Sequence, residues 1–243
     1  MRKLNFAKRN FKELIRDPLS LVFEIALPLF LLFIFQQIKL PDNIYSLNNF
    51  TPGIIIFGLS FITLFTGSLV AKDRGSSLLI RLGISPMKSS DYILGYILSL
   101  LPIILIQNIL FFTLAIILGL SFSINIIFTI IISLIISILF ITLGILIGSL
   151  VSEKGSGGIG SVIVQLVCFT SGMYFPKELI GKVFSKICEL LPFESALVII
   201  RGFLNNNLNI ITTRNIITFS IYLIIILILT IIVFKKKMIS DNK

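Results

Sequence analysis

The sequence predicts an all-α membrane protein with six transmembrane helices, and three observations support this fold class. Hydrophobic residues make up 56% of the 243 residues, charged residues only 13%, and the mean hydropathy is +1.06. A typical soluble domain carries roughly 25% charged residues. The apolar residues gather into long segments, and a bilayer core about 30 Å thick needs roughly 20 helical residues. Among the 21 basic and 11 acidic residues, only Glu24 lies inside such a segment.

Six segments of this single transmembrane domain (residues 1–243) are expected to cross the membrane. They are residues 19–38, 53–71, 93–120, 124–151, 159–175 and 216–234. Ahead of them, residues 1–18 carry apolar side chains near helical spacing with charges between, as in Leu4, Phe11 and Ile15. We expect an amphipathic helix that lies flat on the inner leaflet, and Pro18 marks its break from the first span.

The basic residues predict the orientation. Fifteen lie in the N-terminal flank, the second and fourth loops and the C-terminal tail, whereas six lie in the other three loops. Because cytoplasmic loops carry an excess of Lys and Arg, both termini are expected in the cytoplasm, in the plasma membrane of a bacterium. The net charge of +10 then reflects topology and some attraction to anionic membrane lipid, and no nucleic-acid partner is expected.

Several kinds of chemistry are not expected. The chain has no histidine, and Cys168 and Cys188 are best explained as buried small hydrophobic residues rather than as a disulfide or a metal site. Residues 155–160 match G-x-G-x-x-G but lie between two membrane helices, without the strand that a dinucleotide site needs. No G-x-x-x-x-G-K-[ST] loop occurs. The chain is therefore expected to be neither an enzyme nor a holder of a cofactor.

Two loops are too apolar and too long to be simple turns. In residues 72–91, leucines share one helical face and Arg74 and Arg81 another, which favours a short surface helix that ends at Pro86; a solvated connector is the alternative. In residues 176–204, two apolar stretches flank Pro192 and are too short to span. Re-entrant or interfacial half-helices on the outer side fit this pattern.

These loops resemble ABC transporter permeases of the type-2 exporter class. The family's Gly-x-x-Phe-Pro step, Leu-Pro and terminal Arg correspond here to Gly172, Phe175-Pro176, Leu191-Pro192 and Arg201. The loop from Lys72 to Pro86 is similar to the family's cytoplasmic coupling helix, with Asp73 where Glu is usual and Ser76 where Thr is usual. Arg16-Asp17-Pro18 also resembles the family's sequence before the first span.

The resemblance implies the permease subunit of an ATP-driven exporter. Two permease subunits, identical or different, would each sit on a separate ABC ATPase subunit that holds ATP and Mg. The expected cargo is amphiphilic, such as a drug, an antimicrobial peptide or a lipid. A polysaccharide or teichoic-acid exporter and an uncoupled channel or scaffold are the alternatives. The residues expected to contact the ATPase are Lys72, Asp73, Arg74, Gly75, Leu79, Arg81, Leu82 and Pro86.

Four residues are candidates for the transport path or its gate: Glu24, Phe175, Pro176 and Arg201. Glu24 has a second interpretation, an ion pair at the interface with a basic loop residue, because it lies only six residues after Pro18. Gly144 and Gly148 form a G-x-x-x-G motif that allows two helices to approach closely, either within the subunit or at a dimer interface.

Overall fold

The computed structural model describes residues 2–38, 45–76, 88–175 and 181–240, and these ranges contain helices and turns but no strand, which confirms the all-α fold class. In chain order the elements are α1 (Arg2–Ile15), α2 (Pro18–Leu21), the π-helical turn η1 (Val22–Ala26), α3 (Leu27–Gln37), α4 (Leu47–Gly75), α6 (Ser89–Ile117), α7 (Asn125–Leu150), α8 (Glu153–Thr170), α9 (Lys182–Leu190), α10 (Pro192–Leu204), the 3-10 turn η4 (Leu208–Ile210) and α11 (Thr213–Ser240).

Five helical segments in the described ranges are long and apolar enough to cross a membrane. They are Pro18–Gln37, Leu47–Gly75, Ser89–Ile117, Asn125–Leu150 and Thr213–Lys237. The sixth expected span, residues 159–175, corresponds to α8, which is not among them. Helix α8 has 18 residues, and its first two turns hold Glu153, Lys154 and four glycines, so its hydropathy is low. The six-span prediction is therefore not confirmed in full.

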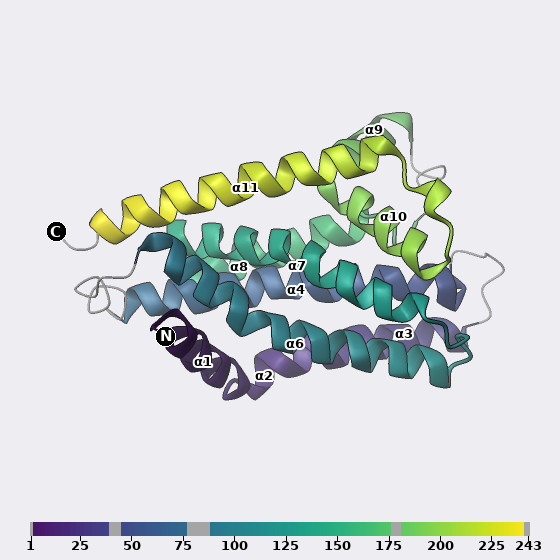
Figure 1. Ribbon diagram of the computed structural model, residues 1–243, viewed down its shortest axis with the longest axis horizontal. Helices are drawn as coiled ribbons and strands as arrows, with labels where there is room; N and C mark the ends of the chain where they lie inside the picture. Colours follow the sequence, from purple (N-terminus) through teal and green to yellow (C-terminus); the bar gives the residue numbers. More distant parts are fainter. Residues whose placement is uncertain (1, 39–44, 77–87, 176–180, 241–243) are drawn as a thin grey trace.

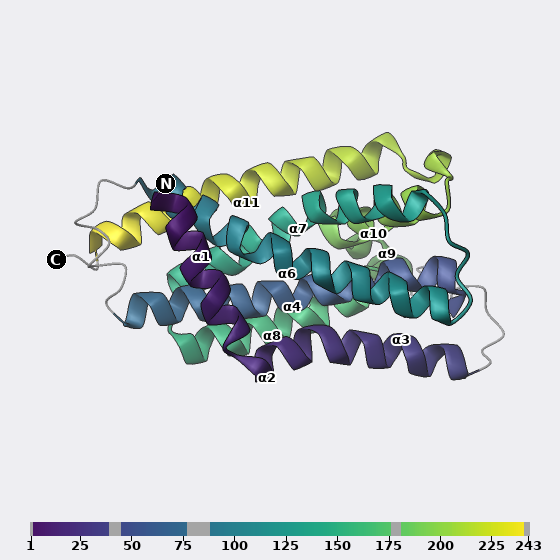
Figure 2. The same ribbon diagram turned by 60° about the horizontal axis from the view of Figure 1, so that its bottom comes forward.

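Helix α4 is the centre of the bundle. In the most apolar 18-residue window of α4, 78% is buried inside the protein. The corresponding buried share is 17% for Pro18–Gln37 and 11% for Thr213–Lys237. Helices α7 and α8 pack along α4, and in Figure 2 the peripheral helices α3 and α11 lie on opposite edges of the bundle. Because so little of these two peripheral helices is buried, a surrounding bilayer can cover much of their apolar surface, together with the exposed apolar side chains of α6, α7 and α8.

The approach of α4 to α7 depends on glycines. A Cβ atom on Gly148 would overlap the carbonyl oxygen of Gly67, and one on Gly144 would lie 2.6 Å from the carbonyl oxygen of Thr63. Small residues at such crossings let two backbones come into contact. The G-x-x-x-G motif of α7 thus packs against α4 of the same chain, which is the first of the two interpretations given above.

Helix α1 lies across one end of the bundle, the same end at which α11 finishes (Figures 1 and 2). It packs on α6, where the ring of Phe6 meets Tyr92 and Tyr96 edge-on at centroid distances of 5.4 and 5.1 Å. Arg16 closes its last turn, and Asp17 caps α2 by accepting from the backbone N–H of Ser20. The helix expected in residues 1–18 is present, and its contact with a leaflet stays a prediction.

Two short helices, α9 and α10, occupy the described part of residues 176–204, at the opposite end of the bundle from α1 (Figure 1). Helix α10 packs against α4, α7 and α11, and most of its residues are buried. Helix α9 is amphipathic and buries only Cys188. The two-helix pattern expected for this loop is therefore present, whereas its insertion into the membrane stays a prediction.

Candidate functional site

A buried ion pair joins three helices at the end of the bundle where α1 lies. Asp73, in the last turn of α4, has a side chain that is 1% exposed. Arg9 of α1 donates from Nη1 to both carboxylate oxygens at 2.7 and 2.8 Å, and the Tyr96 hydroxyl of α6 donates to Oδ2 at 2.8 Å. A buried carboxylate needs such partners, because an unpaired charge is costly to remove from water. This cluster therefore holds α1, α4 and α6 together.

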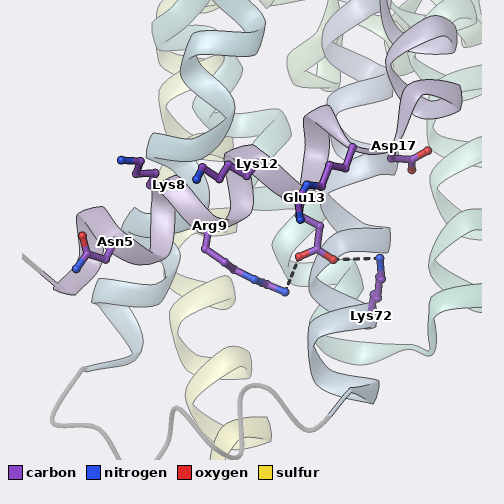
Figure 3. Close-up of a pocket in the computed structure, with 8 residues that line it drawn as sticks. Asn5, Lys8, Arg9, Lys12, Glu13, Asp17 and Lys72 are labelled. Atoms are coloured by element: carbon purple, nitrogen blue, oxygen red, sulfur yellow. Dashed lines mark ion pairs between the residues drawn. The ribbon is translucent and has the colours of Figure 1, made fainter.

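Further contacts hold the last turn of α4. Glu13 of α1 accepts from Arg9 Nη2 at 2.5 Å and from Lys72 Nζ at 3.0 Å (Figure 3). Arg74 Nη1 donates to the carbonyl oxygens of Gly148 and Val151, at 2.9 and 3.3 Å, where α7 ends. Carbonyls at a helix C-terminus lack helical donors, so a cation there is stabilising. The end of α4 is thus tied to α1, α6 and α7.

The predicted ATPase-contact residues divide into two groups. Leu79, Arg81, Leu82 and Pro86 lie outside the described residues. The other four, Lys72, Asp73, Arg74 and Gly75, are not in a loop but form the last turn of α4. The apolar run stops at Ala71, and the helix continues because the charged side chains that follow find partners inside the protein. Lys72 and Gly75 are exposed, whereas the Asp73 carboxylate points inward and is engaged within the chain.

Gly75 does not need to be a glycine for the described part of the fold. It is helical, and an added Cβ would meet no atom of the described residues within 4 Å. Replacing Gly75 with alanine is therefore expected to leave stability unchanged or to raise it by up to about 1 kcal/mol, because alanine has the higher helix propensity. Thermal unfolding of the purified variant measures this; a clear loss of stability would contradict the helical ending of α4.

A groove of about 760 Å³ lies along α1, beside these ion pairs (Figure 3). It is lined by Asn5, Lys8, Arg9, Lys12, Glu13, Arg16, Asp17 and Lys72. In Figure 3 the side chains of Lys8 and Lys12 extend away from the ion pairs of Glu13. With five basic and two acidic residues, the lining carries a net positive charge.

Glu24 lies in the π-helical turn η1 and is only 2% exposed. Pro28, four residues later, has no N–H to donate to the Glu24 carbonyl, and Gln107 Nε2 of α6 donates to that oxygen at 3.0 Å. The Glu24 carboxylate makes no ion pair with any described basic side chain, and its Oε1 atom accepts no hydrogen bond from them. The described residues therefore do not form the interfacial ion pair considered for Glu24.

Arg201 of α10 joins three elements at the opposite end of the bundle. Its Nε donates to the Asn49 carbonyl in the first turn of α4 at 3.1 Å, and its Nη2 lies 3.5 Å from the Gly172 carbonyl after α8. Burial lowers the pKa of Arg201 to about 10, so the side chain stays charged at neutral pH. Gly172 has φ +79°, a conformation that glycine adopts without strain.

Among the described gate candidates, Glu24 does not lie in one site with Arg201. Phe175, beyond the turn after α8, is 48% exposed, and Pro176 lies outside the described residues. Glu24 packs near α6 through Gln107, whereas Arg201 contacts the start of α4. The sequence analysis did not identify Arg9, Tyr96 and Gln107 as site residues. Each of them contacts a helix that is distant in the sequence, and no local sequence pattern indicates such a contact.

Comparison with known proteins identifies the family. A family model for the ABC-2 type transporter matches residues 5–205, which is 201 of the 243 residues. That range runs from α1 to the end of α10 and includes the Asp73 cluster and Arg201. A comparison with curated protein sequences gave no match. The family match, together with the helical membrane architecture, shows that the chain belongs to the ABC-2 type transporter family.

Proposed function

We propose that this chain is the membrane-spanning subunit of an ATP-driven exporter that moves amphiphilic cargo, such as a drug, an antimicrobial peptide or a lipid, out of the cytoplasm. Its family makes it a multi-pass membrane permease of an ABC transporter, and permeases of this family work with an ABC ATPase. In the proposal, ATP and Mg are held by that separate ATPase subunit. Two permease subunits pair around the path, in a bacterial plasma membrane with both termini in the cytoplasm.

The observation that carries the proposal is the position of α4. The C-terminal end of α4 and the N-terminal end of α6 both lie at the end of the bundle where α1 lies (Figure 1), and residues 77–87 join them in the sequence. Helix α4 is the most buried of the five spans and contacts α3, α6, α7, α8 and α10. An ATPase that docks on residues 77–87 therefore acts directly on the helix that touches most of the bundle.

The last turn of α4 supports this transmission. Asp73 is held by Arg9 and Tyr96, and Arg74 is held by the end of α7. Because these contacts are buried or partly buried, a displacement at residues 72–75 moves α1, α6 and α7 with α4 rather than bending one helix end. We propose that the residues contributed to the ATPase are Lys72 and Gly75 from this turn, with Leu79, Arg81, Leu82 and Pro86 from the segment that follows.

At the opposite end, α9, α10 and the turn after α8 are proposed to close the path. Tyr45 donates from its hydroxyl to the Tyr174 carbonyl at 2.9 Å, and its ring stacks on Phe35 at 5.4 Å. Arg201 fixes the same turn through Gly172. Phe175 and Pro176 follow directly, and with Glu24 nearer the other end they are the proposed gate residues. Aromatic rings and few charges suit an amphiphilic cargo.

Replacing Arg81 with glutamate is expected to weaken copurification with the ATPase subunit and to abolish transport, because it reverses a charge in the proposed docking segment. Insertion and yield should change little. The matched control is Lys154→Glu, which makes the same charge reversal at an exposed residue in the first turn of α8. For each variant, copurification measures ATPase binding, and cargo export from cells measures transport. If the two variants were equally harmless, the docking assignment would have to be abandoned.

A further inference from the structure

We propose that the groove on α1 binds the phosphate-bearing headgroup of an anionic membrane lipid. The inference rests on the proposed orientation, in which α1 lies at the cytoplasmic surface of the membrane. Three exposed basic residues, Lys8 and Lys12 of α1 and Arg16 directly after it, stand at intervals of four and are named here the basic row. Residues four apart lie on the same face of a helix.

The basic row carries the uncompensated charge of the groove. Arg9 and Lys72 are both paired with Glu13. Asp17 accepts hydrogen bonds from the backbone and hydroxyl of Ser20. The three side chains of the basic row, in contrast, form no ion pair or hydrogen bond with any described residue. The groove therefore offers three free cations to a ligand that is an anion.

The surface beside the basic row identifies the anion as part of a lipid. Leu4 and Ile15 lie at one edge of the row on α1 and are 58% and 50% exposed, and Leu19, at the start of the first span, is 67% exposed. A helix that lies in the membrane interface presents such an arrangement, with apolar side chains toward the acyl chains and basic ones at the headgroups. A soluble protein partner would leave these apolar side chains unexplained.

The groove suits a single headgroup in size and chemistry. Its volume of about 760 Å³ is large enough for a glycerol phosphate with bound water. Lysine and arginine bind phosphate oxygens through charge-assisted hydrogen bonds, and the Asn5 amide in the lining can donate to another oxygen. A bound lipid would fix α1, and α1 holds the end of α4 through the Arg9–Asp73 pair.

The test uses the purified full chain in a neutral detergent, titrated with short-chain phosphatidylglycerol or, as the uncharged-headgroup comparison, phosphatidylcholine. Native mass spectrometry measures the bound lipid. We expect phosphatidylglycerol to bind more tightly. The variant K8Q/K12Q/R16Q should bind it at least tenfold more weakly, and Lys12→Gln alone roughly fivefold more weakly, since a basic residue near an anionic lipid surface contributes about that factor.

The matched control is K235Q/K236Q/K237Q, which removes the same three charges from the end of α11 at the same side of the membrane. It should bind phosphatidylglycerol like the wild type. An equal loss in both triple variants, or no loss in K8Q/K12Q/R16Q, would overturn the proposal. Thermal unfolding in neutral detergent checks that the triple variants remain folded. If K8Q/K12Q/R16Q does not fold, phosphatidylglycerol binding by the Lys12→Gln variant tests the proposal instead.

Two further outcomes would also overturn the lipid assignment. Competition by inorganic phosphate at the same concentration as the lipid would show that the groove binds free phosphate instead. Normal phosphatidylglycerol binding by K8Q/K12Q/R16Q, with loss of ATPase copurification, would show that the row contacts protein. Failure of the exporter proposal is seen separately, in the Arg81→Glu experiment, because lipid binding by the isolated chain requires neither ATPase nor cargo.

Discussion

Replacing Gly148 with leucine is expected to prevent the bundle from folding. The first side-chain atom would overlap the backbone oxygen of Gly67 and would come within 2.8 Å of Val70 Cβ. A flexible side chain could move aside, but a backbone oxygen in the middle of α4 cannot, so α7 has to separate from α4. Overpacking in a core costs about 1–3 kcal/mol when neighbours can adjust. Because the backbone has to move here, we expect a loss comparable with the whole stability of a typical domain, about 5–15 kcal/mol, so that little folded protein remains.

The matched control is the same substitution at Gly158 of α8, which is exposed and whose Cβ position has no atom of the described part of the chain within 4 Å. Leucine there should leave stability unchanged or raise it by up to about 1 kcal/mol through its helix propensity. Yield of monodisperse protein and its thermal unfolding temperature measure both variants. If Gly148→Leu were as stable as Gly158→Leu, the backbones of α4 and α7 could not be in close contact at Gly148.

Hydropathy predicts the spans well because the lipid-facing and buried surfaces of a membrane bundle are both apolar. It predicts the helix ends less well. Helix α4 begins at Leu47, six residues before the apolar run, and ends four residues after it at Gly75. Its polar ends are retained because Asn49 and Asp73 receive hydrogen bonds from Arg201 and Arg9. Such partners depend on the tertiary fold, so composition does not reveal them.

The candidate site shows the same limit. The sequence marks Asp73 as part of a cytoplasmic motif, but nothing in it distinguishes Arg9 from the other five basic residues of the N-terminal flank. Arg9 is selected only because α1 packs on α6, which brings it to a residue 64 positions away. Similarly, the role of Gln107 follows from Pro28, whose missing N–H leaves the Glu24 carbonyl to be satisfied from another helix.

Replacing Arg9 with glutamine is expected to destabilise the protein by about 2–3 kcal/mol. The change leaves the Asp73 carboxylate, 1% exposed, without its cation. Removing one partner of a buried ion pair typically costs about 3–5 kcal/mol, and the lower range applies because the Arg9 side chain is 37% exposed. Denaturant or thermal unfolding of the purified protein in one detergent measures the change, with circular dichroism as the signal.

The double variant Arg9→Gln/Asp73→Asn tests the cause of that loss. A neutral amide at residue 73 can still accept from the Tyr96 hydroxyl but carries no charge that needs Arg9. It should therefore regain most of the lost stability. Lys3→Gln, an exposed change on the same helix, is the control and should cost less than about 0.5 kcal/mol. If Arg9→Gln lost no more than this control, or if the double variant were less stable than Arg9→Gln, the Arg9–Asp73 pair would not be what holds α1 to α4.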